Sequence, residues 1–356
     1  MTENSPAFFS RDEQQEPSKP VTGNSAMLKW GVAAAVIGAG VVALLNASHS
    51  RKIERDNPPV GKFITIDGVK LHYLDEGQGP VVLLLHGNGT TLDDWIASDV
   101  VRRLSQHHRV IAFDRPGFGY TNRPRTRIWT PFAQASVIAL ALRSIGADNV
   151  TVVGHGFGAL VALALALDDR EMVSAATLIG GYYFPSVRGD VLYLSPPAIP
   201  LLGDVMNHTV SPLLGAAMRG ALEARLFNPK PVPPSWRDGF PFAMSLRPSQ
   251  IRAEAAEAAM MIPAAASLAS RLPELTLSLL IIAGDGDEVS DPADQSRRLA
   301  ETVPGSELRI LEGIGHMVHH SATSAVVAAI EAQVTRGQER ETPQPDLPVT
   351  IAAPVT

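Results

Sequence analysis

The sequence contains no cysteine among its 356 residues. That absence excludes disulfide bonds, a thiolate nucleophile and every metal site that needs cysteine ligands. It leaves the compartment open, because a chain without thiols tolerates either redox environment. Charged residues are also scarce, at 19% of the chain, whereas apolar residues reach 45%. This composition fits a globular protein with a sizeable hydrophobic core.

Positive charge is not in excess either. Lys and Arg number 30 against 36 Asp and Glu, which gives a formal net charge of −6. Such a balance supplies no electrostatic reason to bind nucleic acid, and we expect no nucleic-acid partner. No repeat of fixed period is evident, and the length fits one large domain or two ordinary ones.

The amino-terminal part of the chain divides into two segments of opposite character. Residues 1–25 are polar and rich in Pro, Ser, Glu and Gln, a composition that predicts disorder. Residues 26–47 are mostly apolar, and we interpret them as a single-pass transmembrane anchor. A cleaved secretion signal fits the long acidic tail less well, and a soluble buried helix is the third interpretation. Basic residues on both sides leave the orientation open: Lys29, Arg51, Lys52 and Arg55.

From about residue 60, short apolar runs alternate with stretches of helical character. Residues 63–66 and 69–73 predict a hairpin that turns at Asp67-Gly68. Further apolar runs predict strands over residues 81–85, 110–113, 150–153, 176–179, 279–283 and 308–311. Between them, helices are predicted over residues 92–104, 132–145, 157–167, 292–303 and 324–334. This alternation predicts an α/β fold with a mostly parallel eight-stranded sheet and helices on both faces.

A segment rich in Pro and bulky apolar residues interrupts the alternation over about residues 182–262. We interpret it as a helical lid inserted into a domain of residues 60–335. Its apolar side chains suit a pocket for a small apolar or acyl-bearing molecule, although packing of the lid onto the core explains them equally well. Residues 336–356 are again rich in Pro and predict a second disordered tail.

The sharpest motif is a glycine-rich turn, in which residues 150–153 run into Gly154-His155-Gly156-Phe157-Gly158 and then into a helix. One interpretation is a cradle for a dinucleotide pyrophosphate, but that fingerprint reads G-x-G-x-x-G and comes early in a sheet. The other is the nucleophile elbow G-x-S-x-G, whose small flanking residues let a strained turn point one side chain out of the sheet. Gly154 and Gly158 fill both small positions.

With this turn the chain resembles the α/β-hydrolase superfamily, over about residues 61–333. His86-Gly87-Asn88-Gly89 follows the third strand as the family's oxyanion segment does, and residues 114–119 match its D-x-P-G-x-G loop. Gly284-Asp285-Gly286-Asp287 and Gly315-His316 follow the last two strands, where the family carries its acid and its histidine. The resemblance implies the α/β-hydrolase fold and hydrolase-like activity towards esters or similar small molecules, with no cofactor and no metal.

The central residue of the turn departs from the family pattern. The family holds Ser at this position, or Asp in its dehalogenase and epoxide-hydrolase branches, whereas this chain has Gly156. Glycine cannot attack a carbonyl, so no acyl-enzyme can form there. It also adopts strained dihedrals readily, so a change to Gly is compatible with a stable fold. Two interpretations remain: loss of function, natural or introduced, and altered chemistry in which His316 holds a water.

The other parts of the family's site have candidates. Asp287 fits the acid best, with Asp285 and Glu288 as rivals. His316 fits the histidine better than His319 or His320, because it directly follows the last strand and its glycine.

Backbone N–H groups of Asn88 and Phe157 are expected to form the oxyanion hole. We interpret His86 and His155 as packed neighbours, and Asp114 and Arg115 as residues that fix their loop. Asn88 together with Trp95 also resembles the haloalkane dehalogenases, although those enzymes need an aspartate in the elbow.

Overall fold

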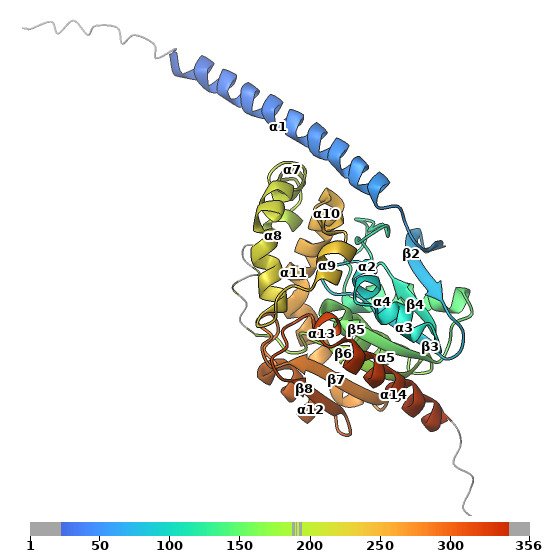
Figure 1. Cartoon of the computed structure of the whole chain (residues 1–356). Coiled ribbons are helices and arrows are strands. Elements are labelled where there is room, and N and C mark those ends of the chain that lie inside the picture. Colours follow the sequence, from blue (N-terminus) through green and yellow to red (C-terminus); the bar gives the residue numbers. More distant parts are fainter. Residues whose placement is uncertain (1–22, 187–188, 190, 192–193, 342–356) are drawn as a thin grey trace, which may run out of the picture.

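The computed structural model describes residues 23–186, 189, 191 and 194–341 and is centred on an eight-stranded sheet (Figure 1). The strands lie in the order β1-β2-β4-β3-β5-β6-β7-β8. β1 pairs antiparallel with β2 and β2 with β4, and the remaining pairs are parallel. The predicted mostly parallel sheet is therefore confirmed. Its strands are β1 (Lys62–Ile66), β2 (Val69–Glu76), β3 (Val81–Leu85), β4 (Arg109–Phe113), β5 (Val150–His155), β6 (Val173–Ile179), β7 (Ser278–Gly284) and β8 (Glu307–Leu311).

Helices cover both faces because the central strands are apolar on both sides. In β3, Leu83 and Leu85 pack into one core cluster with α4 and α5, whereas Val82 and Leu84 pack into a second cluster with α3 and α14. This alternation follows from the two-residue period of a strand. The covering helices are α2 (Asp93–Ala97), α3 (Val100–Leu104), α4 (Pro131–Ser144), α5 (Phe157–Asp168), α12 (Arg298–Thr302), α13 (Val318–Ser321) and α14 (Thr323–Glu341).

The single helix predicted over residues 92–104 and the predicted start of the carboxyl-terminal tail are wrong, whereas the helix predicted over 292–303 is present. The helix predicted over residues 92–104 is split into α2 and α3 at Asp99, whose φ of 68° lies in the left-handed region. The helix predicted over 292–303 begins with a π-helical segment, Ala293–Arg297, before α12. α14 continues to Glu341, past the predicted start of the tail at residue 336, because its carboxyl-terminal part packs on β6. Residues 342–356 lie outside the described residues.

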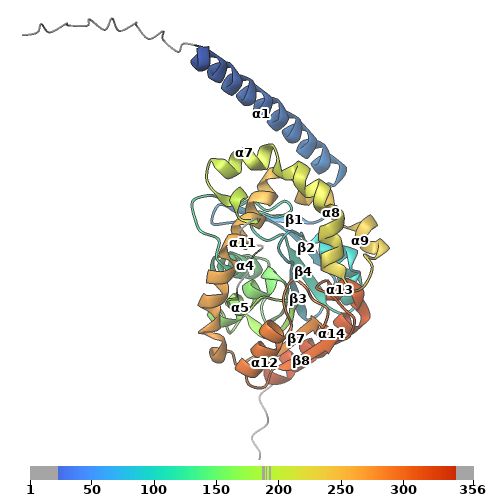
Figure 2. The same ribbon diagram turned by 90° about the vertical axis from the view of Figure 1, so that its left-hand side faces the viewer.

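Between β6 and β7 the chain inserts a group of helices at the place of the predicted lid. They are α7 (Leu202–His208), α8 (Ser211–Phe227), α9 (Pro234–Gly239), α10 (Phe242–Ser245) and α11 (Pro248–Ala269), and short 3₁₀ turns cover Pro196–Ala198 and Leu272–Glu274. Figures 1 and 2 place α7 at the end of the domain nearest α1 and α14 near the opposite end, and Figure 1 shows α10 close to α7. α11 runs past the predicted lid boundary at residue 262, because it continues through Pro263.

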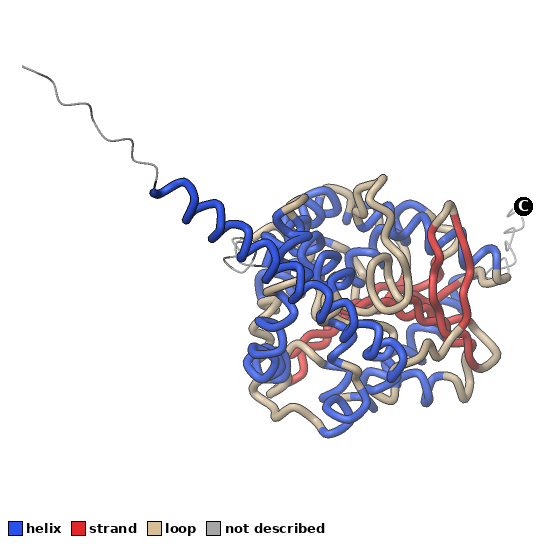
Figure 3. The backbone as a smooth tube through the Cα atoms, turned by 90° about the horizontal axis from the view of Figure 1, so that it is seen from above, coloured by secondary structure: helices blue, strands red, loops and turns tan. Residues whose placement is uncertain are grey.

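The amino-terminal helix α1 (Gly23–Asp56) projects from the domain (Figure 3). Part of it, Met27–Asp56, is the one described helix long and apolar enough to cross a membrane, with a mean hydropathy of 2.0 in an 18-residue window. It begins before residue 26 and ends after residue 47, so the predicted anchor forms only part of it. Its last turns contact the domain, where Glu54 pairs with Arg247 at 2.8 Å. Residues 1–22, most of the predicted tail, lie outside the described residues.

Candidate active site

The glycine-rich turn joins the end of β5 at His155 to the start of α5 at Phe157. Gly156 lies between them with φ 54° and ψ −119°, a conformation that a residue with a side chain rarely adopts. The flanking glycines are required by close packing. A Cβ on Gly154 would lie 2.5 Å from the carbonyl oxygen of Gly158, and a Cβ on Gly158 would lie 2.3 Å from that of Leu85.

Gly156 itself has room for a side chain. A Cβ built on it would lie 3.5 Å from Cα of Gly87 and 3.6 Å from Nε2 of His316, both ordinary van der Waals separations. The cost of a side chain here is therefore backbone strain, of order 1–3 kcal/mol, rather than a steric clash. The central position of the turn is therefore directed at a histidine.

His316 and Asp287 meet at the carboxyl ends of β8 and β7. Nδ1 of His316 lies 2.8 Å from Oδ2 of Asp287, and both side chains are buried. The other carboxylate oxygen of Asp287 accepts the N–H groups of Val289 and Ser290 at 2.8 and 2.9 Å. The carboxylate is thus held in place by its own loop, and it fixes the imidazole through Nδ1. Nε2 remains directed towards Gly156.

The rival candidates have other partners. Asp285 accepts the N–H of Gly313 at 2.7 Å, and Glu288 accepts a hydrogen bond from the side-chain amide of Asn228. His319 and His320 both contact one oxygen of Asp94, at 3.0 and 2.7 Å. Of the predicted residues, the structure therefore brings Asp287 and His316 together and leaves the alternatives outside this pair.

The predicted oxyanion donors belong to two segments near Gly156: Phe157 follows it in the chain, and Asn88 follows Gly87, whose Cα lies 3.5 Å from a Cβ built on Gly156. Phe157 is the first residue of α5, so its N–H has no acceptor within the helix and lies at the positive end of the helix dipole. Asn88 lies on the loop after β3, and its side-chain amide donates to the carbonyl oxygen of Glu254 in α11 at 3.2 Å. The Asn88 side chain is therefore tied to the inserted helices, while its backbone belongs to the loop that contacts the elbow.

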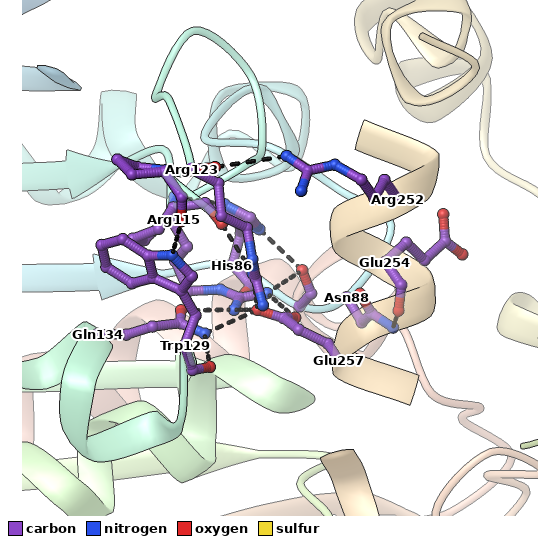
Figure 4. Close-up of polar contacts among 12 residues, drawn as sticks. His86, Asn88, Arg115, Arg123, Trp129, Gln134, Arg252, Glu254 and Glu257 are labelled. Atoms are coloured by element: carbon purple, nitrogen blue, oxygen red, sulfur yellow. Dashed lines mark hydrogen bonds and ion pairs between the residues drawn. The ribbon is translucent and has the colours of Figure 1, made fainter. Parts of the chain in front are cut away.

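Arg115 holds that loop through buried hydrogen bonds (Figure 4). Its guanidinium donates to the carbonyl oxygens of His86 and Gly87 at 2.7 and 2.8 Å. It also forms a two-pronged ion pair with Glu257 of α11, with N···O distances of 2.6 and 3.0 Å. Asp114 accepts the N–H of Leu92 and contacts His72. The predicted loop-fixing roles of Asp114 and Arg115 agree with these contacts.

His86 and His155 are packed as predicted. Nδ1 of His86 contacts the Gly87 carbonyl at 2.8 Å and its Nε2 accepts the Arg115 N–H at 3.0 Å, while burial lowers its pKa to about 4. The His155 ring lies between those of His316 and His319, with centroids 4.7 and 4.6 Å away. Burial holds the pKa of His155 well below its ordinary value. Both rings are neutral at physiological pH and serve as supports.

One group of metal-type ligands occurs in the described part of the chain, formed by Asp94, His319 and His320, whose ligand atoms lie within 4.8 Å of one another. Burial opposes the Asp94 charge, yet the two histidines hold the pKa of this carboxyl well below its ordinary value. Both rings contact the same oxygen, Oδ1 of Asp94, through Nε2. Oδ2 of Asp94 and Nδ1 of each ring are buried without a hydrogen-bond partner in the described part of the chain. The cluster anchors α13, which directly follows His316.

Sequence reasoning missed two residues that border the site. Gly180 follows β6 with φ +53°, and a Cβ on it would lie 3.2 Å from Nδ1 of His316. Glu254 of α11 points away from the Arg115 network (Figure 4), and a Cβ on Gly89 would lie 3.2 Å from its Oε1. Burial, together with the nearby Glu257, raises the pKa of Glu254 to about 7. Neither residue belongs to a motif, so the sequence carried no signal for them.

Comparison with known proteins gives this arrangement a family. A model of the family described as alpha/beta hydrolase fold matches residues 80–323. This chain belongs to the α/β-hydrolase family. Its curated relatives include hydrolases: it is 29% identical to a 2-hydroxy-6-oxo-2,4-heptadienoate hydrolase of Pseudomonas putida, over 74% of this chain and 91% of that protein.

Solved structures confirm the α/β-hydrolase fold. The esterase EaEST of Exiguobacterium antarcticum matches 78% of this chain and 100% of its own length, with a TM-score of 0.64 and 22% identity. A bacterial membrane phospholipase A matches 88% of this chain and 97% of its own length, with a TM-score of 0.61 and 23% identity.

Proposed function

We propose that this α/β-hydrolase is a hydrolase-like protein with an incomplete triad, in which Gly156 takes the place of the nucleophile. The single observation that carries the proposal is the geometry around this glycine. Its elbow conformation directs position 156 at Nε2 of His316, and His316 is paired with Asp287 at 2.8 Å. Asn88 and Phe157 supply the oxyanion donors in this proposal. The acid, the base and the oxyanion hole are retained, and only the attacking side chain is missing.

In this arrangement His316 acts as a general base on water. Its Nε2 removes a proton from a water bound beside Gly156, and the hydroxide oxygen forms a bond to the ester carbonyl carbon. The carbonyl electron pair moves onto the oxygen, where the Asn88 and Phe157 N–H groups stabilise it. When the tetrahedral intermediate collapses, the bond to the alkoxide breaks and the His316 imidazolium returns the proton to that leaving group. Acid and alcohol are released without an acyl-enzyme.

The expected substrates are esters or similar small molecules with an apolar or acyl part. The apolar composition of the inserted segment, residues 182–262, supports this class. The expected rate is low, because a triad enzyme without its nucleophile keeps only roughly 10³–10⁴-fold acceleration over water.

Hydrolysis of p-nitrophenyl butyrate tests this mechanism. The full chain should hydrolyse the ester faster than buffer, and His316→Ala should abolish the excess rate. His107→Ala is the matched control, since His107 is exposed on the loop before β4 and should leave the rate unchanged. Equal rates for the unmodified chain and His316→Ala would refute the water mechanism.

A second candidate function is ligand binding without catalysis. It is favoured by the positive φ of Gly156, because glycine relieves strain that a nucleophile with a side chain would impose. Loss of the nucleophile, natural or introduced, then leaves a stable fold in which the pair of Asp287 and His316 persists. A non-hydrolysable ketone analogue of the ester separates the two candidates. Tight binding of the ketone with no His316-dependent hydrolysis would support the binding protein.

We further propose that α1 anchors the domain in a membrane through residues 26–47. The length of the helix and the mean hydropathy of 2.0 in an 18-residue window of Met27–Asp56 support a single-pass span. A signal sequence would give the same pattern. Release of the protein from washed membranes by carbonate would favour a signal sequence over an anchor. The side of the membrane on which the domain lies is left open by the basic residues at both ends.

A further inference from the structure

Large apolar side chains that are exposed outside α1 gather on one part of the inserted helices. Most of them lie between residues 199 and 222, with exposed fractions from 37% to 81%. We call this surface the α7–α8 apolar face. It consists of Ile199, Leu201, Leu202, Val205, Val210, Leu213, Leu214, Met218 and Leu222.

The face is organised by helical periodicity. Leu214, Met218 and Leu222 recur every four residues and therefore share one side of α8. Leu202 and Val205 lie one turn apart on α7. Each of these side chains is exposed to solvent, and a gathering of exposed apolar side chains on neighbouring helices marks a contact with another protein or with lipid.

Helix α1 contacts the part of the insertion that carries the α7–α8 apolar face, and this contact indicates what covers the face. The side-chain amide of Asn46 donates to the carbonyl oxygens of His208 and Thr209, at 2.8 and 3.1 Å, where α7 ends. Asn46 is also where the apolar run of α1 ends, since Leu44 and Leu45 precede it and basic residues follow within two turns. The boundary of a bilayer crossed by α1 therefore falls at the level of α7 (Figures 1 and 2).

We propose that the α7–α8 apolar face lies in the interface of the same bilayer that α1 crosses, so that its partner is a lipid surface. This inference rests on the proposed anchor. Without a bilayer, water would surround the nine exposed apolar side chains of this face. Lipid would instead bury them next to the apolar run of α1. A second copy of the chain is the competing occupant, and the continuity of the face with α1 favours lipid.

The position of α8 connects this surface with the candidate active site. Its amino-terminal end carries Leu213 and Leu214 of the apolar face. At its carboxyl-terminal end, the Leu226 carbonyl accepts the Met317 N–H at 3.2 Å, and Phe227 packs against His320. Both of these contacts lie within four residues of His316. The insertion thus spans from the bilayer surface to the site, which suits an amphiphilic substrate that partitions into lipid.

The absence of cysteine allows a direct test, because each introduced cysteine becomes the single labelling site. Leu213→Cys on the apolar face, Leu44→Cys in α1 and Leu140→Cys on α4 are labelled with an environment-sensitive fluorophore. All three leucines are exposed, at 62%, 73% and 38%. The full-length variants are reconstituted into phosphatidylcholine vesicles with and without lipids that carry a nitroxide on the acyl chain.

The inference predicts that the nitroxide lipid quenches the probes at residues 213 and 44 to a similar degree and leaves the probe at residue 140 bright. Quenching at residue 44 alone would overturn the docking of the apolar face while leaving the anchor intact. No quenching at either residue would overturn the anchor itself. If the probe at residue 213 is shielded only when many protein molecules share a vesicle, and nitroxide lipid does not quench it, the face would be assigned to a second copy and the inference overturned. Quenching at all three residues would indicate non-specific adsorption and also overturn the inference.

Discussion

The buried ion pair between Arg115 and Glu257 gives the most informative stability prediction. Glu257→Gln keeps the size and one carbonyl oxygen of the side chain but removes its charge. Both partners are fully buried, with 0% of either side chain exposed, so the Arg115 charge is left without its counterion. Removing one partner of a buried pair costs about 3–5 kcal/mol, because the remaining charge stays desolvated. We expect Glu257→Gln to lower the free energy of unfolding by that amount.

Arg115→Met should cost more than Glu257→Gln. It removes the ion pair and also the donors to the carbonyl oxygens of His86 and Gly87. An unsatisfied buried polar group costs about 1–3 kcal/mol each. The double variant Arg115→Met/Glu257→Met removes both charges, so it should regain part of the loss but not the contribution of the two carbonyls.

Urea unfolding of the full-length chain in detergent micelles, followed by tryptophan fluorescence, measures these differences. The matched control is Arg143→Gln, which breaks the more exposed pair with Asp169 and should cost less than about 1 kcal/mol. A loss for Glu257→Gln as small as that of the control would refute the assignment of a desolvated pair that joins α11 to the loop of His86 and Gly87.

Two further predictions concern residues beside the site. The pKa of Glu254 is about 7 in the folded chain against an ordinary 4.5. Between these pH values the folded state therefore binds more protons than the unfolded state, so the free energy of unfolding should fall as the pH rises from 4.5 to 7. Glu254→Gln should remove up to ~3 kcal/mol of that fall, at 1.36 kcal/mol per pKa unit; identical unfolding profiles from pH 5 to 8 would contradict this. Gly180→Ala should push the ring of His316 aside and reduce any His316-dependent ester turnover, whereas Gly146→Ala, with a similar φ and open space around it, should reduce stability only. Equal activities of the two variants would show that Gly180 does not position His316.

The sequence predicted the order of strands along the chain and the pairing of Asp287 with His316 for a physical reason. Parallel strands end at one edge of a sheet, so residues that follow successive strands meet there. The existence of strands such as β3 and β5 follows from their apolar runs. Boundaries were less accurate because they depend on tertiary contacts. α11 continues through Pro263, although proline usually ends a helix, and α14 is extended by packing on β6.

The supporting network of the site could not be predicted in the same way. Arg115 was expected to fix its loop, but its partner Glu257 lies 142 residues further along the chain and belongs to no motif. Gly180 and Glu254 likewise become relevant only when β6 and α11 are placed beside the elbow. Contacts between residues that are far apart in the sequence depend on how the strands and the inserted helices pack together. Local sequence patterns do not encode this packing.

The most direct test of the central claim is covalent labelling of position 156. A fluorophosphonate reacts with a serine hydroxyl activated by a histidine, so it should leave this chain unlabelled and label the Gly156→Ser variant at the introduced hydroxyl alone, as read by mass spectrometry of peptides. His316→Ala in the same background should abolish the label, because Nε2 of His316 then no longer faces the hydroxyl. An adduct on any residue of the unmodified chain, or a Gly156→Ser variant that folds and stays unlabelled, would contradict the account.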